Sequence, residues 1–264
     1  MQKPSLFIVK VGGNIIDNPM ALEAFLVDFT KLEGPKILVH GGGKIATTLA
    51  QKMGVETVMI EGRRITDLAT IEIVTMVYGG LINKNIVAKL QALQCNAIGL
   101  TGADAGLVKA SKRPVVTIDY GYVGDIVKVN SEGISTLIKA GLVPIFAPLT
   151  ADTTGQILNT NADTMAKEIS VAMAKDFEVK LLYCFEKNGV LSNIEDDNSV
   201  ISNLQFTDYQ DNKKQGNINK GMIPKLDNAF DAKKAGVKKV FICHAQNLLT
   251  IDTNSQIATE IIIL

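Results

Sequence analysis

The sequence predicts an α/β fold, a three-layer αβα sandwich in which helices cover both faces of a mainly parallel central sheet. Short β-branched runs alternate with longer segments of helical spacing, the order expected of strand–helix–strand crossover units. The composition agrees, since 47% of the residues are hydrophobic and only 5% are aromatic, with no Trp and 22 Gly. Such a core consists of Ile, Val, Leu and Ala joined by many tight turns. The 264 residues suit one large domain or two lobes that share a sheet.

The N-terminal half begins with a strand, LFIVKV, at residues 6–11. A helix follows over 18–34, because Asn18 and a proline form a start signal, apolar residues recur at helical spacing, and a glycine ends it. The next elements are a strand over 36–43, a helix over 44–54, a hairpin over 55–66, a long helical segment over 67–94, a strand over 96–102, a two-stranded ribbon over 115–129, a helix from 131 and a strand over 143–150. Gly79-Gly80 is expected to bend or break the long helical segment.

The C-terminal half opens with a strand that turns sharply into a helix, over 156–175. It continues with a strand over 180–191, a helix over 219–236, a strand over 238–245 and a final strand over 258–264. The stretch 195–217 is rich in Asp, Asn, Lys and Gln and lacks periodicity, which indicates a mobile surface excursion. We expect an N-terminal lobe at residues 1–174 and a C-terminal lobe at 175–264.

Charge and composition exclude several function classes. Lys and Arg together number 27, as do Asp and Glu, so no positive field attracts a nucleic acid. The chain has no signal-peptide pattern and no apolar run near the roughly 20 residues that span a bilayer, which indicates a cytoplasmic protein without membrane attachment. The three cysteines, Cys95, Cys184 and Cys243, are widely spaced in apolar surroundings and are expected to be buried, reduced thiols.

Four segments stand where a strand is expected to end and a helix to begin: KVGGN (10–14), HGGGK (40–44), NTNAD (159–163) and NKGMIPK (219–225). Ligands of open α/β sheets bind at such junctions. Each segment alone is better explained as an ordinary turn, cap or solvated lysine. Together they supply glycines for close approach to anionic oxygens, lysines as compact cations and an aspartate to orient them, which is typical of phosphoryl transfer. The glycine spacing matches neither the P-loop nor the dinucleotide-binding pattern.

Eight stretches carry a resemblance to a known family: KVGGN, LVHGGGK, EGRRIT, NKNIVAKL, AIGLTGADAG, GYVGDI, ILNTNADTMA and NKGMIPKL. The chain resembles the amino-acid kinase family along nearly its whole length, and HGGGK, EGRRIT and NTNAD together resemble its members that phosphorylate acylated glutamate. The resemblance implies that the N-terminal lobe binds the acyl amino acid and the C-terminal lobe binds ATP. The implied reaction is ATP-dependent phosphorylation of the side-chain carboxylate of N-acetyl-L-glutamate, a step of arginine biosynthesis.

The resemblance also implies the site residues. Lys10 and Lys225 are expected to contact the transferring phosphoryl group from two sides, with Asp163 holding both lysines. The residues implied to bind the acyl amino acid are Gly42, Gly43, Arg64, Asn159 and Asn161, with the Arg64 guanidinium on the α-carboxylate. The residues implied to bind phosphate or ATP are Gly12, Gly13, Glu186, Asn188, Gly189, Asn219 and Gly221.

The reaction needs no catalytic histidine, because a glutamate side chain with a pKa of about 4.3 is already ionised at neutral pH. Catalysis then depends on aligning two anions and neutralising their repulsion. His40 and His244 are interpreted as structural residues, although His40 lies beside the glycine turn and is positioned to shape it. Mg²⁺ is expected to arrive on ATP, held mainly by phosphates and water, so that no protein metal site is predicted.

Two features depart from the usual family pattern. Many relatives have a Ser-Asp pair after a strand of the nucleotide lobe, whereas this chain has YCFEKNGVL, with Glu186 in the place of that aspartate. The nucleotide contacts are therefore expected to differ in detail. Arginine-inhibited hexameric relatives carry an extra helix before the first strand, and only residues 1–5 precede it here. This favours an arginine-insensitive homodimer.

Three alternatives stay open. A succinyl group in place of the acetyl group would add a carboxylate, for which Arg63, Lys112 and Arg113 are candidate partners. Another member of the family, such as glutamate 5-kinase, carbamate kinase, aspartokinase or uridylate kinase, is disfavoured by the EGRRIT hairpin. A non-catalytic metabolite sensor is least favoured, because binding alone would tolerate the loss of one of the two lysines or of the aspartate.

Overall fold

The fold is built on an eight-stranded sheet with the strand order β12–β14–β13–β11–β1–β2–β8–β5. The structure, a computed structural model, describes residues 3–60, 63–193, 195–216, 218, 221–251 and 257–263. The strands of this sheet are β1 (Ser5–Val11), β2 (Lys36–His40), β5 (Ala97–Leu100), β8 (Val143–Phe146), β11 (Glu178–Phe185), β12 (Asn203–Gln205), β13 (Lys239–His244) and β14 (Ala258–Ile262). All neighbouring pairs are parallel except β13–β14, which confirms the mainly parallel sheet.

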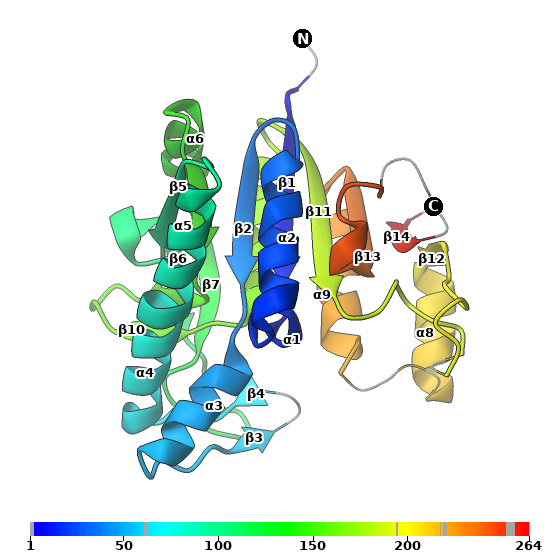
Figure 1. The fold of residues 1–264 in the computed structure, drawn as a ribbon. Coiled ribbons are helices and arrows are strands. Elements are labelled where there is room, and N and C mark those ends of the chain that lie inside the picture. The colour runs from blue at the N-terminus through cyan, green and yellow to red at the C-terminus, as the bar shows by residue number, and fades with distance from the viewer. Residues whose placement is uncertain are drawn as a thin grey trace.

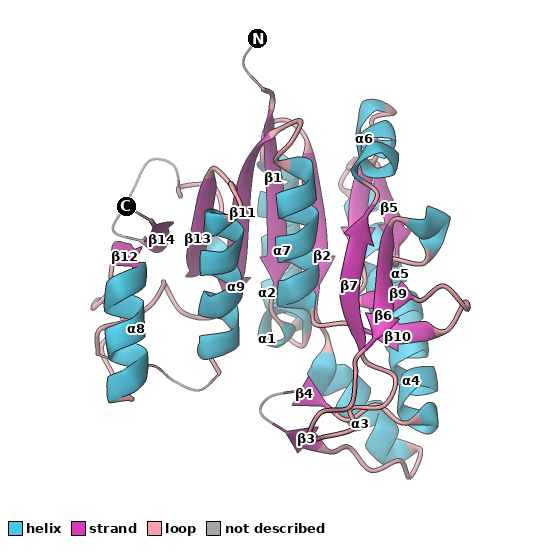
Figure 2. Ribbon diagram, turned by 180° about the vertical axis from the view of Figure 1, so that it is seen from behind, coloured by secondary structure: helices cyan, strands magenta, loops and turns pink. Residues whose placement is uncertain are grey.

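Helices form a layer on each face of this sheet (Figures 1 and 2). Helices α2 (Pro19–Lys31) and α5 (Asn83–Ala92) cover one face, and α7 (Ala162–Met173) and α9 (Ile223–Lys234) cover the other. The remaining helices are α1 (Gly13–Ile16), α3 (Gly43–Lys52), α4 (Leu68–Val74), α6 (Ser131–Lys139) and α8 (Phe206–Gln215), with the π-helix η1 (Thr75–Ile82) and the 3₁₀ turns η2 (Asp104–Gly106) and η3 (Ala245–Asn247). The three-layer αβα sandwich is therefore confirmed. Of the described helices, none has both the length and the apolar composition that crossing a bilayer requires.

Two smaller sheets lie at the side of the N-terminal half. One has the order β10–β9–β6–β7, formed by β6 (Val108–Lys112), β7 (Gly124–Val129), β9 (Leu149–Ala151) and β10 (Ile157–Asn159). The other is the predicted hairpin of β3 (Met59–Ile60) and β4 (Arg63–Arg64). Figure 2 places this hairpin below the carboxyl ends of the central strands, where it borders the candidate site.

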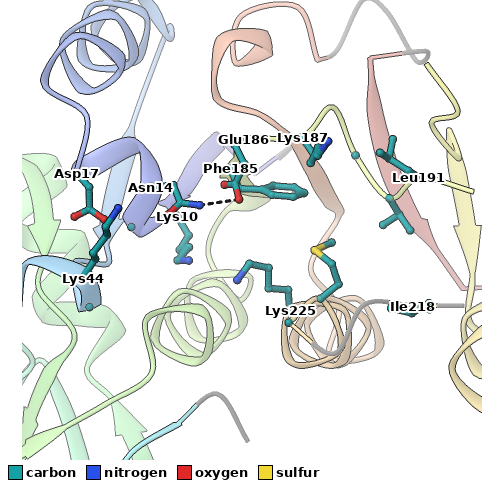
Figure 3. Close-up of a pocket in the computed structure, with 17 residues that line it drawn as sticks. Lys10, Asn14, Asp17, Lys44, Phe185, Glu186, Lys187, Leu191, Ile218 and Lys225 are labelled. Carbon is teal, nitrogen blue, oxygen red and sulfur yellow. Dashed lines mark hydrogen bonds between the residues drawn. The ribbon is translucent and has the colours of Figure 1, made fainter. Parts of the chain in front are cut away.

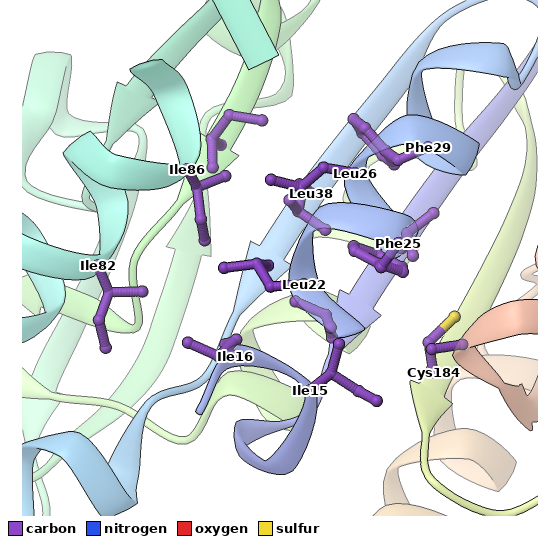
Figure 4. Packing of buried hydrophobic residues seen from close by; sticks show 14 of the residues in the cluster. Ile15, Ile16, Leu22, Phe25, Leu26, Phe29, Leu38, Ile82, Ile86 and Cys184 are labelled. Carbon is purple, nitrogen blue, oxygen red and sulfur yellow. The ribbon is translucent and has the colours of Figure 1, made fainter. Parts of the chain in front are cut away.

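Side-chain alternation along β1 divides the core into two layers. Leu6 and Ile8 pack with α7 and α9, whereas Val9 and Val11 pack with α2 and α5. Figure 4 shows the second layer, where the apolar face of α2 rests on the sheet. That face consists of Leu22, Phe25, Leu26 and Phe29, all buried. The same alternation turns Lys10 toward α7, so the strand carries its ammonium group to the helix that bears Asp163.

The helical segment over 67–94 is not broken at Gly79-Gly80. Helix α4, the π-helix η1 and helix α5 follow one another without interruption, and both glycines lie inside η1. The π-helix is rare, and it occurs mostly as a wide turn inserted within an α-helix, often near a functional site. The prediction of a break at these glycines is therefore wrong.

Three further expectations differ from the structure. The ribbon forms between β6 and β7, so its first strand precedes the predicted range, and residues 115–119 lie in no strand. The strand predicted over 143–150 divides at Pro148 into β8 and β9, which belong to different sheets. The stretch 195–217 contains β12 and α8, held by Tyr209, whose ring stacks on Phe230 with centroids 5.0 Å apart.

Candidate functional site

Two cavities adjoin at the carboxyl ends of the parallel strands. The first cavity has a volume of about 520 Å³ and is lined by both halves of the chain (Figure 3). Lysines and glycines line one part of it, and apolar residues such as Val190, Leu191 and Met222 line another. The second cavity, of about 220 Å³, lies between the glycine turn after β2, strand β4 and the start of α7. Gly43 lines both cavities, which therefore meet at this turn.

An ion-paired triad of Lys10, Asp163 and Lys225 lies at the first cavity. Lys10 comes from the end of β1, Asp163 from the first turn of α7 and Lys225 from the first turn of α9. The Lys10 Nζ atom is 2.7 Å from Oδ1 of Asp163, and the Lys225 Nζ atom is 3.4 Å from Oδ2. The Tyr183 hydroxyl donates to the Asp163 backbone oxygen at 3.0 Å, which fixes the turn. The structure thus brings together the three predicted catalytic residues from distant parts of the sequence.

Burial and mutual charge set the protonation of this triad. Burial lowers the pKa of Lys10, and the attraction of Asp163 counteracts this effect only in part. Burial by itself raises the pKa of Asp163, but the two ammonium groups outweigh it, so the pKa lies below the usual carboxyl value. Asp163 is therefore ionised at neutral pH and serves to hold two cations, rather than to accept a proton.

The glycine turns after β1 and β2 lie side by side. The Gly12 N–H donates to the Cys184 carbonyl at 3.0 Å, and the Gly41 N–H donates to the Val11 carbonyl at 3.2 Å. Gly42 has a φ of +141°, and a Cβ atom there would collide with Cδ1 of Ile82, so only glycine fits. Both turns open a helix, and free N–H groups at helix N-termini bind anions.

Arg64 lies on β4 and forms part of the wall of the second cavity. Its Nη2 donates to the Gly43 carbonyl at 2.9 Å and to Oγ1 of Thr47 at 2.8 Å, and its Nη1 donates to Oγ1 of Thr57 at 3.1 Å. The side chain is buried, with 8% of its surface exposed. Its guanidinium is thereby locked in one orientation, next to the Tyr78 ring system that also lines this cavity.

Asn159 and Asn161 also line the second cavity. The Asn159 Nδ2 donates to Oγ1 of Thr66 at 3.0 Å, which couples the end of β10 to the hairpin side of the site. The Asn161 Oδ1 accepts from the Thr164 N–H at 3.0 Å, so this residue is the N-cap of α7. The structure therefore shows that Asn161 has a capping role in addition to its position on the cavity wall.

Most residues predicted to bind phosphate or ATP lie at the first cavity. Gly12, Gly13, Glu186, Gly189 and Gly221 all line it. The Glu186 Oε1 accepts from Nδ2 of Asn14 at 2.8 Å, a bond that links the two halves of the chain across the cavity (Figure 3).

The two other residues of that set lie elsewhere or outside the described part. Asn188 does not line the first cavity, because its side chain contacts the Asp197 carbonyl at 3.3 Å and Asn247 at 3.4 Å. Asn219 lies outside the described residues.

The cavity walls also include residues that sequence reasoning did not assign. Asn14, Asp17 and Lys44 line the first cavity, and Tyr78 lines the second. Lys44 stands within the quoted HGGGK segment, and its position beside the three glycines was the available signal. Asp17 carries no motif of its own, since it falls between the glycine turn and the cap of α2.

His40 anchors the glycine turn after β2. It is fully buried, and its Nδ1 is 2.8 Å from the Gly41 carbonyl. A carbonyl only accepts, so Nδ1 carries the proton and Nε2 is the acceptor for Nδ2 of Asn83 at 3.2 Å. The Asn83 Nδ2 also donates to the Ile145 carbonyl at 2.9 Å, which connects the turn to β8. Burial lowers the pKa of His40 to about 4, so it is neutral at pH 7, in agreement with its interpretation as a structural residue.

The model of the amino acid kinase family matches residues 5–244, which is most of the chain. The chain belongs to the amino acid kinase family. It is 56% identical to the acetylglutamate kinase of Cytophaga hutchinsonii over 99% of both chains. It is 54% identical to the acetylglutamate kinase of Parabacteroides distasonis over 92% of this chain and 95% of that one. The predicted membership of the family is thus confirmed.

Solved structures confirm the fold of this family member. The N-acetylglutamate synthase of Neisseria gonorrhoeae, complexed with coenzyme A and N-acetyl-glutamate, aligns with a TM-score of 0.80 at 20% identity, over 99% of this chain and 60% of that chain. The carbamate kinase of Giardia lamblia bound to AMP-PNP aligns with a TM-score of 0.70 at 16% identity, over 100% of both chains.

Proposed function

We propose that this chain transfers the terminal phosphoryl group of ATP to the side-chain carboxylate of N-acetyl-L-glutamate, forming an acyl phosphate in arginine biosynthesis. The observation that carries the proposal is the ion-paired triad of Lys10, Asp163 and Lys225 at the first cavity, which adjoins the second cavity at Gly43. The identity of 50–56% to curated acetylglutamate kinases supports the choice of substrate.

Lys10 and Lys225 would contact the transferring phosphoryl group from two sides. In a loose transition state, negative charge spreads over the equatorial oxygens, and two ammonium groups stabilise it electrostatically. Asp163 keeps both cations in place, since it binds one with each carboxylate oxygen. The acceptor carboxylate is already ionised, so the site needs no general base. The lysines also reduce the repulsion between this carboxylate and the phosphates.

The second cavity would hold the acyl amino acid. Arg64 is locked beside Gly43, where its guanidinium can pair with the α-carboxylate. Gly42 and Gly43 would donate N–H groups to the reacting carboxylate, and Asn159 with Asn161 would contact the acylated amino group. Because Gly43 also lines the first cavity, the reacting carboxylate would meet the terminal phosphate at this turn.

The first cavity would hold ATP. Four glycines would lie close to the phosphates: Gly12, Gly13, Gly189 and Gly221. The Glu186 carboxylate would contact the ribose or the adenine. We assign Asn188 only an indirect role, because its side chain contacts other residues, and Asn219 retains its predicted role as a nucleotide contact.

The polar groups at this cavity are mostly ammonium and backbone N–H groups, which bind phosphate oxygens rather than a metal ion. Mg²⁺ would therefore take its ligands mainly from the phosphates of ATP. No three His, Cys, Asp or Glu side chains of the described residues gather as a metal site. The ion would supply charge neutralisation on the phosphates.

A hydroxamate assay for acyl phosphate tests the proposal, with N-acetylglutamate, glutamate, aspartate and carbamate as acceptors and ATP as the donor. We expect turnover with N-acetylglutamate and none with the other three. If only another acceptor is phosphorylated, the chain is a different kinase of the same family. If no acceptor is phosphorylated, the result favours a non-catalytic metabolite sensor.

A second candidate substrate, N-succinyl-L-glutamate, is favoured by Arg113. This residue lines the second cavity, and its Nε bonds to Asp125 at 3.1 Å. Its Nη1 is buried without a hydrogen-bond partner among the described residues. N-acetylglutamate has two carboxylates, one for the phosphoryl group and one for Arg64, whereas a succinyl group supplies a third for Arg113.

The ratio of kcat/KM for the two acyl substrates decides between them. If succinyl is the natural group, Arg113→Gln lowers kcat/KM for N-succinylglutamate by tenfold or more and hardly changes it for N-acetylglutamate. Arg63→Gln is the matched control, because Arg63 lines the same cavity but is exposed. A wild-type preference for the acetyl substrate would reject this candidate.

We further propose that the chain works as a cytoplasmic homodimer, with residues 1–174 binding the acyl amino acid and 175–264 binding ATP. The segment from α4 through η1 exposes apolar side chains at Leu68, Met76 and Leu81, which a second copy would cover. Light scattering that gives the mass of one chain would contradict the dimer.

A further inference from the structure

Besides Lys10, Lys225 and Lys187, which is paired with Asp197, a further ammonium group lines the first cavity and has no role in the proposed mechanism. Lys44 lies in the first turn of α3, directly after Gly43, and its side chain is exposed. It lines the same cavity as Lys10 and Lys225. Within the described part of the chain it forms no ion pair closer than 4.0 Å, unlike the other two lysines. Lys44 is therefore a cation available to a ligand of this cavity.

Asp17 lies beside Lys44, close to the glycine turn after β1. Its carboxylate lies at the end of α1, and both oxygens are inaccessible to solvent with no hydrogen-bond partner among the described residues. Burial raises the pKa of Asp17, and the positive charge of Lys44 opposes that rise. In Figure 3 the two side chains lie next to each other at the margin of the cavity. The Asp17 carboxylate therefore lies close enough to Lys44 for the two charges to attract each other.

The position of Lys44 indicates which part of a nucleotide it would meet. Figure 3 shows Lys44 at the end of the cavity opposite Leu191 and Ile218, with Lys10 and Lys225 between them. The apolar end suits an adenine base, and the lysine pair suits the transferring phosphoryl group. A nucleotide laid along this axis presents its last phosphate to Lys44, on the side where the two cavities meet at Gly43.

We propose that Lys44 is a third phosphate-binding cation, which contacts the terminal phosphoryl group of ATP and thereby makes the site prefer ATP to ADP. The proposal rests on the proposed function, since it assumes that the first cavity holds the phosphoryl donor. The N-terminus of α3 adds its free N–H groups at the same point. The preference follows because ADP lacks the phosphoryl group that Lys44 reaches.

The experiment measures affinity by calorimetry, with Mg²⁺ and without acyl substrate, for the β,γ-imido analogue of ATP and for ADP. We expect Lys44→Gln to raise Kd for the ATP analogue about tenfold, the loss of one charge-assisted hydrogen bond, and to change Kd for ADP less than twofold. The matched control is Lys52→Gln, because Lys52 lies on the same helix and lines only the adjoining cavity of about 350 Å³. That variant is expected to bind both nucleotides as the wild type does.

Each outcome decides the proposal. An unchanged Kd for the ATP analogue in the Lys44→Gln variant overturns it, and so does an equal loss of affinity for both nucleotides. Since Lys44 is exposed and unpaired among the described residues, we expect the variant to unfold at the wild-type urea concentration, which separates binding from folding. The proposed function is tested independently, by wild-type turnover of acylated glutamate.

Discussion

Replacement of His40 by glutamine should reduce the loss of unfolding free energy that the protein suffers when the pH falls. The imidazole has a pKa of about 4 in the folded chain, against an ordinary value of 6.5. Between these pH values the unfolded chain binds more protons than the folded one, so the free energy of unfolding falls as the pH falls. The contribution of the neutral His40 ring to the free energy of unfolding is fully present above pH 6.5 and is lost as the pH decreases toward 4. The difference between the folded and unfolded pKa values of this fully buried ring corresponds to about 3 kcal/mol of unfolding free energy.

Urea unfolding at several pH values from 7.5 to 4.5 measures this effect. We expect the wild type to lose about 2.5 kcal/mol more than His40→Gln over that range, because other titrating groups act equally in both proteins. The substitution also replaces the partner of Asn83, but the resulting change in stability at pH 7.5 does not enter the comparison, which uses only the slope. His244→Gln is the control, because His244 is only half-buried and should change the slope less. Parallel curves for wild type and His40→Gln would refute the reasoning.

Three further variants test the site. Lys10→Arg keeps the charge but changes the shape of the donor, so kcat should fall by about 100-fold while calorimetry shows little change in ATP affinity; near-normal turnover would remove Lys10 from the mechanism. Arg64→Ala should raise KM for the acyl amino acid by about tenfold or more in steady-state assays, and an unchanged KM would reject its role as carboxylate ligand. Gly42→Ala places a Cβ against Ile82 at a φ of +141° and should lower the unfolding free energy by about 1–3 kcal/mol; Gly34→Ala, at a φ of +90° in open space, should cost less.

Sequence reasoning located site residues most reliably where they lie at the end of a predicted strand. Lys10 ends an apolar strand and precedes two glycines, so its position at the edge of the sheet follows from periodicity. Its distance to Asp163 does not follow from the sequence, because Asp163 comes from a helix 153 positions further along the chain. The docking of that helix depends on the whole core. Family resemblance, rather than spacing, indicated that contact.

Other features depend on tertiary contacts that leave no periodic pattern. Helix α8 is polar on most of its surface, and it is held by the rings of Phe206 and Tyr209 packed against Phe230. Pro148 interrupts the apolar run 143–150, which was predicted as one strand but forms two strands that belong to different sheets. Asp17 and Lys44 lie 27 positions apart in the sequence and line the same cavity because two glycine turns lie side by side in the fold. The HGGGK segment gave a signal for Lys44, whereas no sequence pattern singled out Asp17.

The first turn of helix α7 lines the second cavity and, through Asp163, holds two lysines that line the first. Its capping residue Asn161 and neighbouring Thr164 face the second cavity, whereas Asp163 holds the lysines of the first. A ligand that shifts this turn from one side also moves the groups on the other side. The affinities of the two substrates should therefore be coupled, and thermodynamic reciprocity requires each to change the binding of the other by the same factor.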